Sequence, residues 1–268
     1  MQPLLAYEPF IRLGVFAGML ALMALLEALL PRRTRRIDRL IRWPGNFAIV
    51  LIDTFALRLL FPVASVGFAL LMAERQTGLF NQFNIPVEIA IVASMLLLDL
   101  TIYAQHIVFH RIPFLWRFHR MHHTDLDLDV TSGTRFHPVE ILLSVLIKFA
   151  AIALLGAPAI AVLFFEVLLN AGAMFNHANL RLPKSLDSAL RLLIVTPDMH
   201  RVHHSVVPAE TDANFGFNLS CWDRIFGTYI PQPQAGHARM IIGLPDYQDP
   251  KVQRIDNMLV QPWKNPGP

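Results

Sequence analysis

Three clusters of histidine constrain the fold of this chain more than any other feature of its sequence. Eight of the eleven histidines follow the patterns HxxxH, HxxHH and HxxHH. Residues three or four apart share a helix face, so each cluster can direct its imidazoles at one point. Neutral imidazole is the commonest metal ligand, and three matching clusters favour metal binding over a packing role. The clusters are His106 and His110; His119, His122 and His123; and His200, His203 and His204.

The composition is that of a membrane protein. Hydrophobic residues make up 54% of the 268 residues and charged residues only 16%, against about 25% charged in typical soluble domains. The single cysteine, Cys221, excludes an intramolecular disulfide framework and a cysteine-rich zinc site. The net charge of +3 gives no reason to expect a nucleic-acid partner. The N-terminus lacks a basic start and a small-residue cleavage motif, so we expect no cleavable signal.

We predict an all-α integral membrane protein with about four transmembrane helices, including a hairpin, and a cytoplasmic helical cap that carries the histidine clusters. Residues 13–30 are apolar except for Glu27 near their end, and they are long enough to cross a hydrocarbon core of about 30 Å. The arginine-rich stretch from Arg32 to Arg42 follows this span, which indicates its cytoplasmic end. A nucleic-acid patch is the alternative interpretation of these arginines, and they could also hold an anionic head group.

The next apolar stretch, residues 47–73, contains Asp53 and Arg58. Either its first part lies in the membrane interface and residues 59–73 cross, or one long tilted helix crosses with the charged pair buried. Because residues five apart are not good helix neighbours, we favour the first version.

Proline residues mark the third span. Pro86 opens it, as proline often does at a helix start, and the span runs directly into His106 and His110. Pro113 should end or kink this helix. The first histidine pair is therefore expected on the cytoplasmic extension of a membrane helix.

Residues 141–177 are predicted to form a helical hairpin, because Gly156, Ala157 and Pro158 interrupt a long apolar segment. Lys148 and Glu166 would lie at similar depth in this hairpin and could pair, since charges inside a bilayer are usually paired or functional. If the spans alternate in direction, every histidine cluster falls on the cytoplasmic side.

The remainder of the chain is more polar. Thr196 is expected to cap a helix that carries the third histidine cluster. The stretch after Tyr229 is rich in proline and glycine and is interpreted as a surface segment, with His237 as a surface residue. The predicted domains are an N-terminal membrane region with two spans (1–85), a catalytic domain (86–230) and a C-terminal surface tail (231–268).

Eight imidazoles are too many for one metal ion, so we expect two ions with four or five histidines each. His106–His123 should supply one half of this site and the third cluster, with His177, the other half. Imidazole suits zinc, copper, iron and nickel, so the ligand type does not choose the metal. Four polar residues are expected to support the ligands, with cap, surface or ion-pair roles as the alternatives; they are Asp198, Asn170, Glu166 and Asp99.

Residues 106–229 resemble the fatty acid hydroxylase/sterol desaturase superfamily. The resemblance rests on the three histidine motifs, on HPVE and NHAN between them, and on the ending NFGFNLSCWDRIFGT. It implies two iron ions held by the eight clustered histidines, with zinc as a possible substitute in purified protein. His177 in NHAN matches a further family histidine and would be a ninth ligand. His137 in HPVE is one more candidate, with packing as its alternative role.

The resemblance implies an enzyme that uses O2 and two electrons to hydroxylate or desaturate a fatty acyl or sterol-like lipid. No dinucleotide fingerprint or haem-attachment motif occurs, so the electrons should come from a separate ferredoxin, cytochrome or reductase. Two alternatives are a membrane zinc hydrolase, although His106–His110 lacks the glutamate of HExxH, and a non-catalytic metal-binding membrane protein. We expect a bacterial inner membrane, with the endoplasmic reticulum as the alternative.

Overall fold

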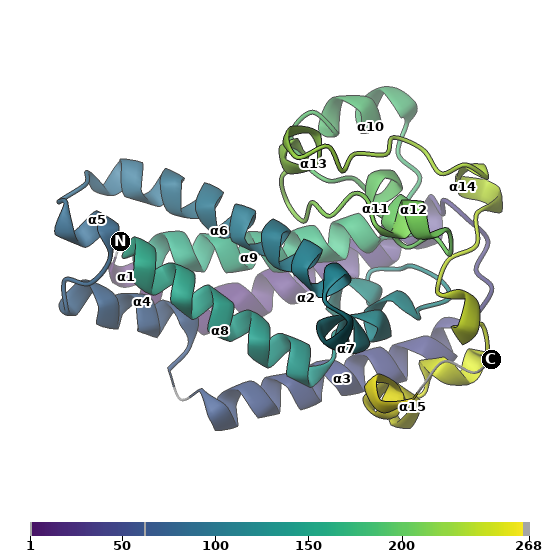
Figure 1. Ribbon diagram of the computed structural model, residues 1–268, viewed down its shortest axis with the longest axis horizontal. Coiled ribbons are helices and arrows are strands. Elements are labelled where there is room, and N and C mark those ends of the chain that lie inside the picture. The colour runs from purple at the N-terminus through teal and green to yellow at the C-terminus, as the bar shows by residue number, and fades with distance from the viewer. Residues whose placement is uncertain (1, 62, 265–268) are drawn as a thin grey trace.

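The computed structural model describes residues 2–61 and 63–264, and over these residues the chain forms helices and no β-strand. Long helices lie side by side along the longest axis, and several short helices gather at one end (Figure 1). The α-helices are α1 (Gln2–Ala6), α2 (Glu8–Leu29), α3 (Arg39–Leu60), α4 (Ser65–Glu74), α5 (Leu79–Gln82), α6 (Val87–Arg111), α7 (Pro113–His123), α8 (Pro138–Leu155), α9 (Ala159–His177), α10 (Lys184–Leu190), α11 (Pro197–His203), α12 (Pro208–Thr211), α13 (Cys221–Ile225), α14 (Gly236–Arg239) and α15 (Ile255–Val260). Short 3-10 turns are η1 (Ser132–Thr134), η2 (Pro245–Tyr247), η3 (Pro250–Gln253) and η4 (Gln261–Trp263).

Within the described residues, five helical segments are long and apolar enough to cross a membrane, judged by length and composition. They are α2, the segment from Arg39 to Gln82, α6, α8 and α9. This number is one more than the predicted four. The all-helical class and the multi-pass character agree with the sequence prediction.

The stretch with two internal charges forms helix α3 and, after a break, helix α4. Both Asp53 and Arg58 belong to α3, where Asp53 is buried and Arg58 is exposed. The predicted boundary near residue 58 therefore lies slightly too early in the chain, since α3 continues to Leu60.

Helix α9 is the centre of the bundle, with α2, α4 and α6 packed against it. It is the most buried of the five candidate spans. The hairpin turn before it closes at Gly156, whose φ of 67° is a left-handed conformation that glycine adopts without strain. The main apolar core lies between these helices and includes Leu98, Ile152 and Leu163.

An ion-pair network joins α2, α4, α8 and α9. It lies on α9 at Glu166, about three turns before His177. The Lys148 ammonium lies 2.6 Å from Oε1 of Glu166, as the hairpin geometry predicted. Arg12 of α2 lies 2.6 Å from Oε2 of the same carboxylate, and Ser65 of α4 donates a 2.7 Å hydrogen bond to Oε1. Glu166 therefore has a structural environment in which both oxygens are satisfied.

The C-terminal segment packs into the fold more deeply than its proline and glycine content suggested. Met258 of α15 forms a buried cluster with Ile49 of α3 and Met121 of α7. The expectation that His237 is a surface residue was wrong, because its side chain is buried with 4% of its area exposed. Helices far away in the sequence, α3 and α7, pack against this C-terminal segment, and its local composition does not reveal such contacts.

Candidate metal centre

The first two histidine clusters face each other because the chain reverses between α6 and α7. Helix α6 ends at Arg111, and Pro113 opens α7 after one extended residue, as predicted. This reversal brings Nε2 of His106 within 3.1 Å of Nε2 of His119. The next turn repeats the arrangement, with 3.1 Å between the Nε2 atoms of His110 and His123.

The third cluster, on α11 and its C-cap residue His204, lies with His177, at the end of α9, beside the histidines of α6 and α7. Thr196 caps α11, since its side chain accepts a hydrogen bond from the backbone N–H of Met199, and this confirms the predicted helix start. The end of α9 brings in His177, whose Nε2 lies 3.0 Å from that of His200 and 3.0 Å from that of His122.

Nine histidines form two compact groups, and within each group one ligand atom per residue lies within 4.8 Å of all the others. The groups hold five and four histidines, and that each binds one ion stays a prediction. The first group contains His106, His110, His119, His123 and His203, and the second contains His122, His177, His200 and His204.

The two HxxHH motifs exchange one histidine each. Helix α7 gives His119 and His123 to the first group and His122 to the second. Helix α11 and its C-cap residue His204 give His200 and His204 to the second group and His203 to the first. Adjacent residues on a helix point about 100° apart, so neighbouring histidines cannot serve the same centre. The prediction that each half comes from its own segment of the chain was therefore wrong.

Six of the nine imidazoles have Nδ1 hydrogen-bonded to an oxygen, which leaves Nε2 directed at the group. Such bonds fix the ring orientation and the tautomer of a metal-binding histidine. The acceptors are Phe215 O for His106 (2.9 Å), Asp212 for His110 (3.3 Å), Glu140 for His119 (2.6 Å), Arg135 O for His122 (3.1 Å), Ala173 O for His177 (2.7 Å) and Ala213 O for His203 (2.8 Å).

Two carboxylates among these acceptors, Glu140 and Asp212, were not singled out from the sequence. Glu140 follows His137 by three residues in the HPVE motif, which offered a signal for it. Asp212 lies far from His110 in the chain and gave no local signal. Both residues accept hydrogen bonds from histidines of the first group only.

The donor atoms fit a soft-to-intermediate metal ion that takes neutral imidazole. Nε2 of His203 is buried and has no hydrogen-bond partner among the described residues. Burial lowers the pKa of the His203 imidazole to about 3 and lowers the pKa of His200 and His204 well below the ordinary value. The rings are therefore held neutral with free lone pairs, which is the form that binds metal.

Aromatic rings enclose both groups. Phe136 stacks on His122 with ring centroids 4.5 Å apart, and Phe215 packs edge-on against His106 at 5.4 Å. Trp116 lies 4.7 Å from His110, the least buried of the nine histidines. These contacts exclude water from the centre, and the His110 side chain is itself buried with 1% of its area exposed.

The loop between α7 and α8 supports the centre and is buried almost throughout. Arg42 of α3 holds it, with hydrogen bonds of 2.7 and 2.8 Å to Asp125 and 2.6 Å to Asp129. The carbonyl of Arg135 at the end of the loop accepts from His122. This loop is thus a fixed support for the grouped histidines.

The four polar residues expected to support the ligands contact other partners in the described chain. Asp198 binds Arg32 at 3.0 Å and also Arg201, and Asp99 accepts hydrogen bonds from Asn218 and Trp222. Glu166 lies in the ion-pair network, and Asn170 donates to the Glu166 carbonyl. Asp99 shares a helical face with His106 and Asp198 lies two residues before His200, but each carboxylate binds a nearby amide or arginine instead of the histidine.

His137 lies outside both groups. It precedes α8 and accepts a hydrogen bond from the backbone N–H of Val139, and its ring packs between Phe118 and Trp263. Its alternative role in packing is the one that this geometry supports.

Comparison with known proteins places the chain. Its sequence is 32% identical over 149 residues to an ornithine lipid hydroxylase of Rhizobium tropici, covering 56% of this chain and 44% of that protein. It is 28% identical over 189 residues to an alkylglycerol monooxygenase of Danio rerio, covering 63% and 40%. A human cholesterol 25-hydroxylase is 27% identical over 140 residues, covering 52% and 50%. The chain thus spans at most half the length of these relatives.

No solved structure matches the chain. A sequence model of the fatty acid hydroxylase family matches residues 91–228, which is just over half of the chain and includes all nine grouped histidines. The chain therefore belongs to the fatty acid hydroxylase family.

Proposed function

We propose that the protein is a membrane-bound di-iron oxygenase that hydroxylates a C–H bond of a lipid. The single observation that carries the proposal is the convergence of nine buried imidazoles into two adjoining groups of five and four. The relatives, named as hydroxylases and monooxygenases, favour hydroxylation over desaturation. The balanced reaction consumes O2, two electrons and two protons and yields an alcohol and water.

The two groups of histidines would each hold one iron ion. Bound iron would supply the redox chemistry that activates O2, and zinc could replace it in purified protein because both ions accept imidazole. The protein's own contribution is to orient the ligands through their Nδ1 hydrogen bonds and to exclude water with the surrounding aromatic rings.

The lipid substrate is expected to reach the centre along the bilayer. His106 and His110 belong to α6, a candidate span, so a lipid beside this helix lies next to the first group of ligands. A fatty acyl or sterol-like substrate satisfies this geometry. Because this chain covers at most half of each relative, the particular lipids named for those relatives are not assigned to it.

The centre is proposed to face the cytoplasm. The arginine-rich segment after α2 contacts the loop after α7, since the backbone N–H groups of Arg36 and Ile37 donate to Asp127. Both therefore lie at the end of the bundle that holds the histidines, and arginines beside a span favour the cytoplasmic side. A separate ferredoxin, cytochrome or reductase would deliver electrons there, in a bacterial inner membrane or the endoplasmic reticulum.

The test is a single-turnover assay on purified protein reconstituted anaerobically with iron. A membrane lipid extract and a chemical reductant are supplied, and 18O2 is admitted. We expect a lipid that gains one 18O atom by mass spectrometry. His203→Ala should abolish this product, whereas His137→Ala should retain it if the protein remains folded.

The proposal fails if the iron-loaded protein yields no oxygenated lipid from extracts of either bacterial or endoplasmic-reticulum membranes. Hydrolysis products in the absence of O2 would indicate the zinc hydrolase alternative. A product with a new double bond and no 18O would indicate desaturation by the same centre.

A further inference from the structure

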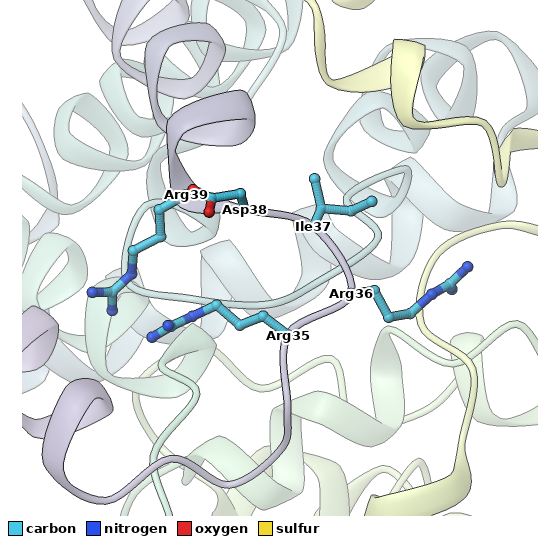
Figure 2. Close-up of a pocket in the computed structure, with 5 residues that line it drawn as sticks. All are labelled: Arg35, Arg36, Ile37, Asp38 and Arg39. Atoms are coloured by element: carbon cyan, nitrogen blue, oxygen red, sulfur yellow. The ribbon is translucent and has the colours of Figure 1, made fainter.

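A cationic pocket lies beside the end of the first candidate span, away from the histidine ligands. It measures about 410 Å³ and is lined by Arg35, Arg36, Ile37, Asp38 and Arg39. Figure 2 shows Arg35 and Arg39 extending to the same side of the backbone and Arg36 extending to the other. Three arginines against one aspartate give the pocket a positive charge.

Among the described residues, the guanidinium group of Arg35 is the one in this arginine-rich segment that has no hydrogen bond or ion pair. Its Nε and Nη2 atoms are buried and have no hydrogen-bond partner among the described residues. Buried donors without a partner are costly, so such a group indicates a ligand that the pocket binds. The other arginines are engaged: Arg32 with Asp198, Arg33 with the Met240 carbonyl, Arg36 with Gln248 and Arg39 with Glu27.

Arg39 contributes a second donor to the same side. One of its nitrogens binds Glu27 at 2.6 Å, while its Nε is buried without a partner within the described chain. Asp38 is the one acid in the lining, and its Oδ1 accepts a 2.7 Å hydrogen bond from the backbone N–H of Leu40 at the start of α3. Its carboxylate is therefore committed to capping the helix.

The backbone that carries the pocket is fixed in advance. Asp127 accepts hydrogen bonds of 2.6 and 2.7 Å from the N–H groups of Arg36 and Ile37. Upstream, the side chain of Asn179 accepts from the N–H of Arg33 at 3.0 Å. A prearranged site loses less conformational entropy on binding.

The position of the pocket identifies the source of its ligand. It lies between α2 and α3, and the residues that flank it are strongly exposed apolar side chains: Leu29 (65%), Leu30 (52%), Leu40 (84%) and Ile41 (52%). In a bilayer these side chains would contact acyl chains, which puts the guanidinium groups at the level of lipid phosphates. Guanidinium groups bind phosphate oxygens through paired N–H donors.

We infer that Arg35 and Arg39 form a binding site for the phosphate of an anionic lipid head group. The site is independent of the proposed oxygenase chemistry and would persist if the centre held another metal. Because the segment also anchors Asp127 and Asn179, a bound lipid would brace the contact between the first two spans and the loop after α7.

The test uses the full chain in neutral detergent and native mass spectrometry. Phosphatidylglycerol and phosphatidylcholine with the same acyl chains are supplied in equal amounts. We expect the wild type to retain phosphatidylglycerol about tenfold more than phosphatidylcholine. Arg35→Gln should remove this preference and Arg35→Lys should reduce it, since lysine keeps the charge but lacks the fork. Arg239→Gln, which removes an exposed arginine elsewhere, is the matched control.

Circular dichroism of each variant establishes that the helices are intact. Arg35→Gln with wild-type lipid preference overturns the inference, and so does an equal loss in Arg239→Gln, which would indicate general surface charge. Inorganic phosphate is added in a further arm. If it displaces phosphatidylglycerol at equal concentration, the pocket is a free-phosphate site and the lipid assignment is wrong.

Discussion

Oε1 of Glu140 lies 2.6 Å from Nδ1 of His119, and both side chains are buried. This contact joins the first residues of α8 to the second histidine cluster. A carboxylate in this position holds the proton of the imidazole on Nδ1, which turns the Nε2 lone pair toward the other histidines of the first group.

Replacing Glu140 with alanine should weaken metal binding by the first group about 10- to 100-fold, because His119 loses the acceptor that orients it. Glu140→Gln keeps an acceptor and should lose less. Competition against a chelator, with iron counted per chain, measures the effect. Glu74→Ala, at an exposed position at the end of α4, is the control. Retention of both ions with wild-type affinity in Glu140→Ala would show that the contact is not needed.

Replacing either of two neighbouring histidines, His203 at the end of α11 or its C-cap residue His204, should empty a different site. His203→Ala removes a ligand of the first group and His204→Ala removes one of the second. Anomalous diffraction at the iron edge, recorded for each variant, resolves the two positions. We expect each variant to lose occupancy mainly at its own site. Loss at the same site in both would contradict the exchange of ligands between α7 and α11.

The sequence predicted which histidines gather at the centre better than it predicted how they divide between the two groups. Spacing was enough to select eight of the nine grouped histidines, and the family resemblance added His177. Pro113 and Gly156 were enough to locate two chain reversals. The exchange of His122 and His203 depends on the rotation of α7 against α11, which spacing does not determine. The contact between Glu140 and His119 likewise requires the α7–α8 loop to be folded around Arg42.

Removing the Asp198 carboxylate should destabilise the fold with little change in metal content. Asp198 binds Arg201, which is buried, and Arg32. In Asp198→Asn the buried guanidinium loses its charged partner, at a cost of about 1–3 kcal/mol. Thermal unfolding with iron analysis on the same samples measures both properties. Asp246→Asn, at an exposed position, is the control, and loss of iron without loss of stability would restore a direct role beside the ligands.

His237 should make the protein less stable in mild acid. Its buried ring has no hydrogen-bond partner among the described residues, and burial lowers its pKa to about 4, although Asp198 opposes this shift and the nearby Arg201 adds to it. The unfolded chain has a histidine pKa of about 6.5. Between these values the unfolded state binds a proton that the folded state does not, so stability falls as pH decreases from about 6.5 to about 4.

The contribution of His237 is at most about 3 kcal/mol. Chemical denaturation of the iron-loaded wild type and His237→Gln, at about pH 7.5 and about pH 5, isolates it, because the other histidines titrate alike in both proteins. The variant should lose less stability than the wild type on acidification. A difference between the two proteins that does not change with pH would show that His237 is already protonated, or equally accessible, in the folded state.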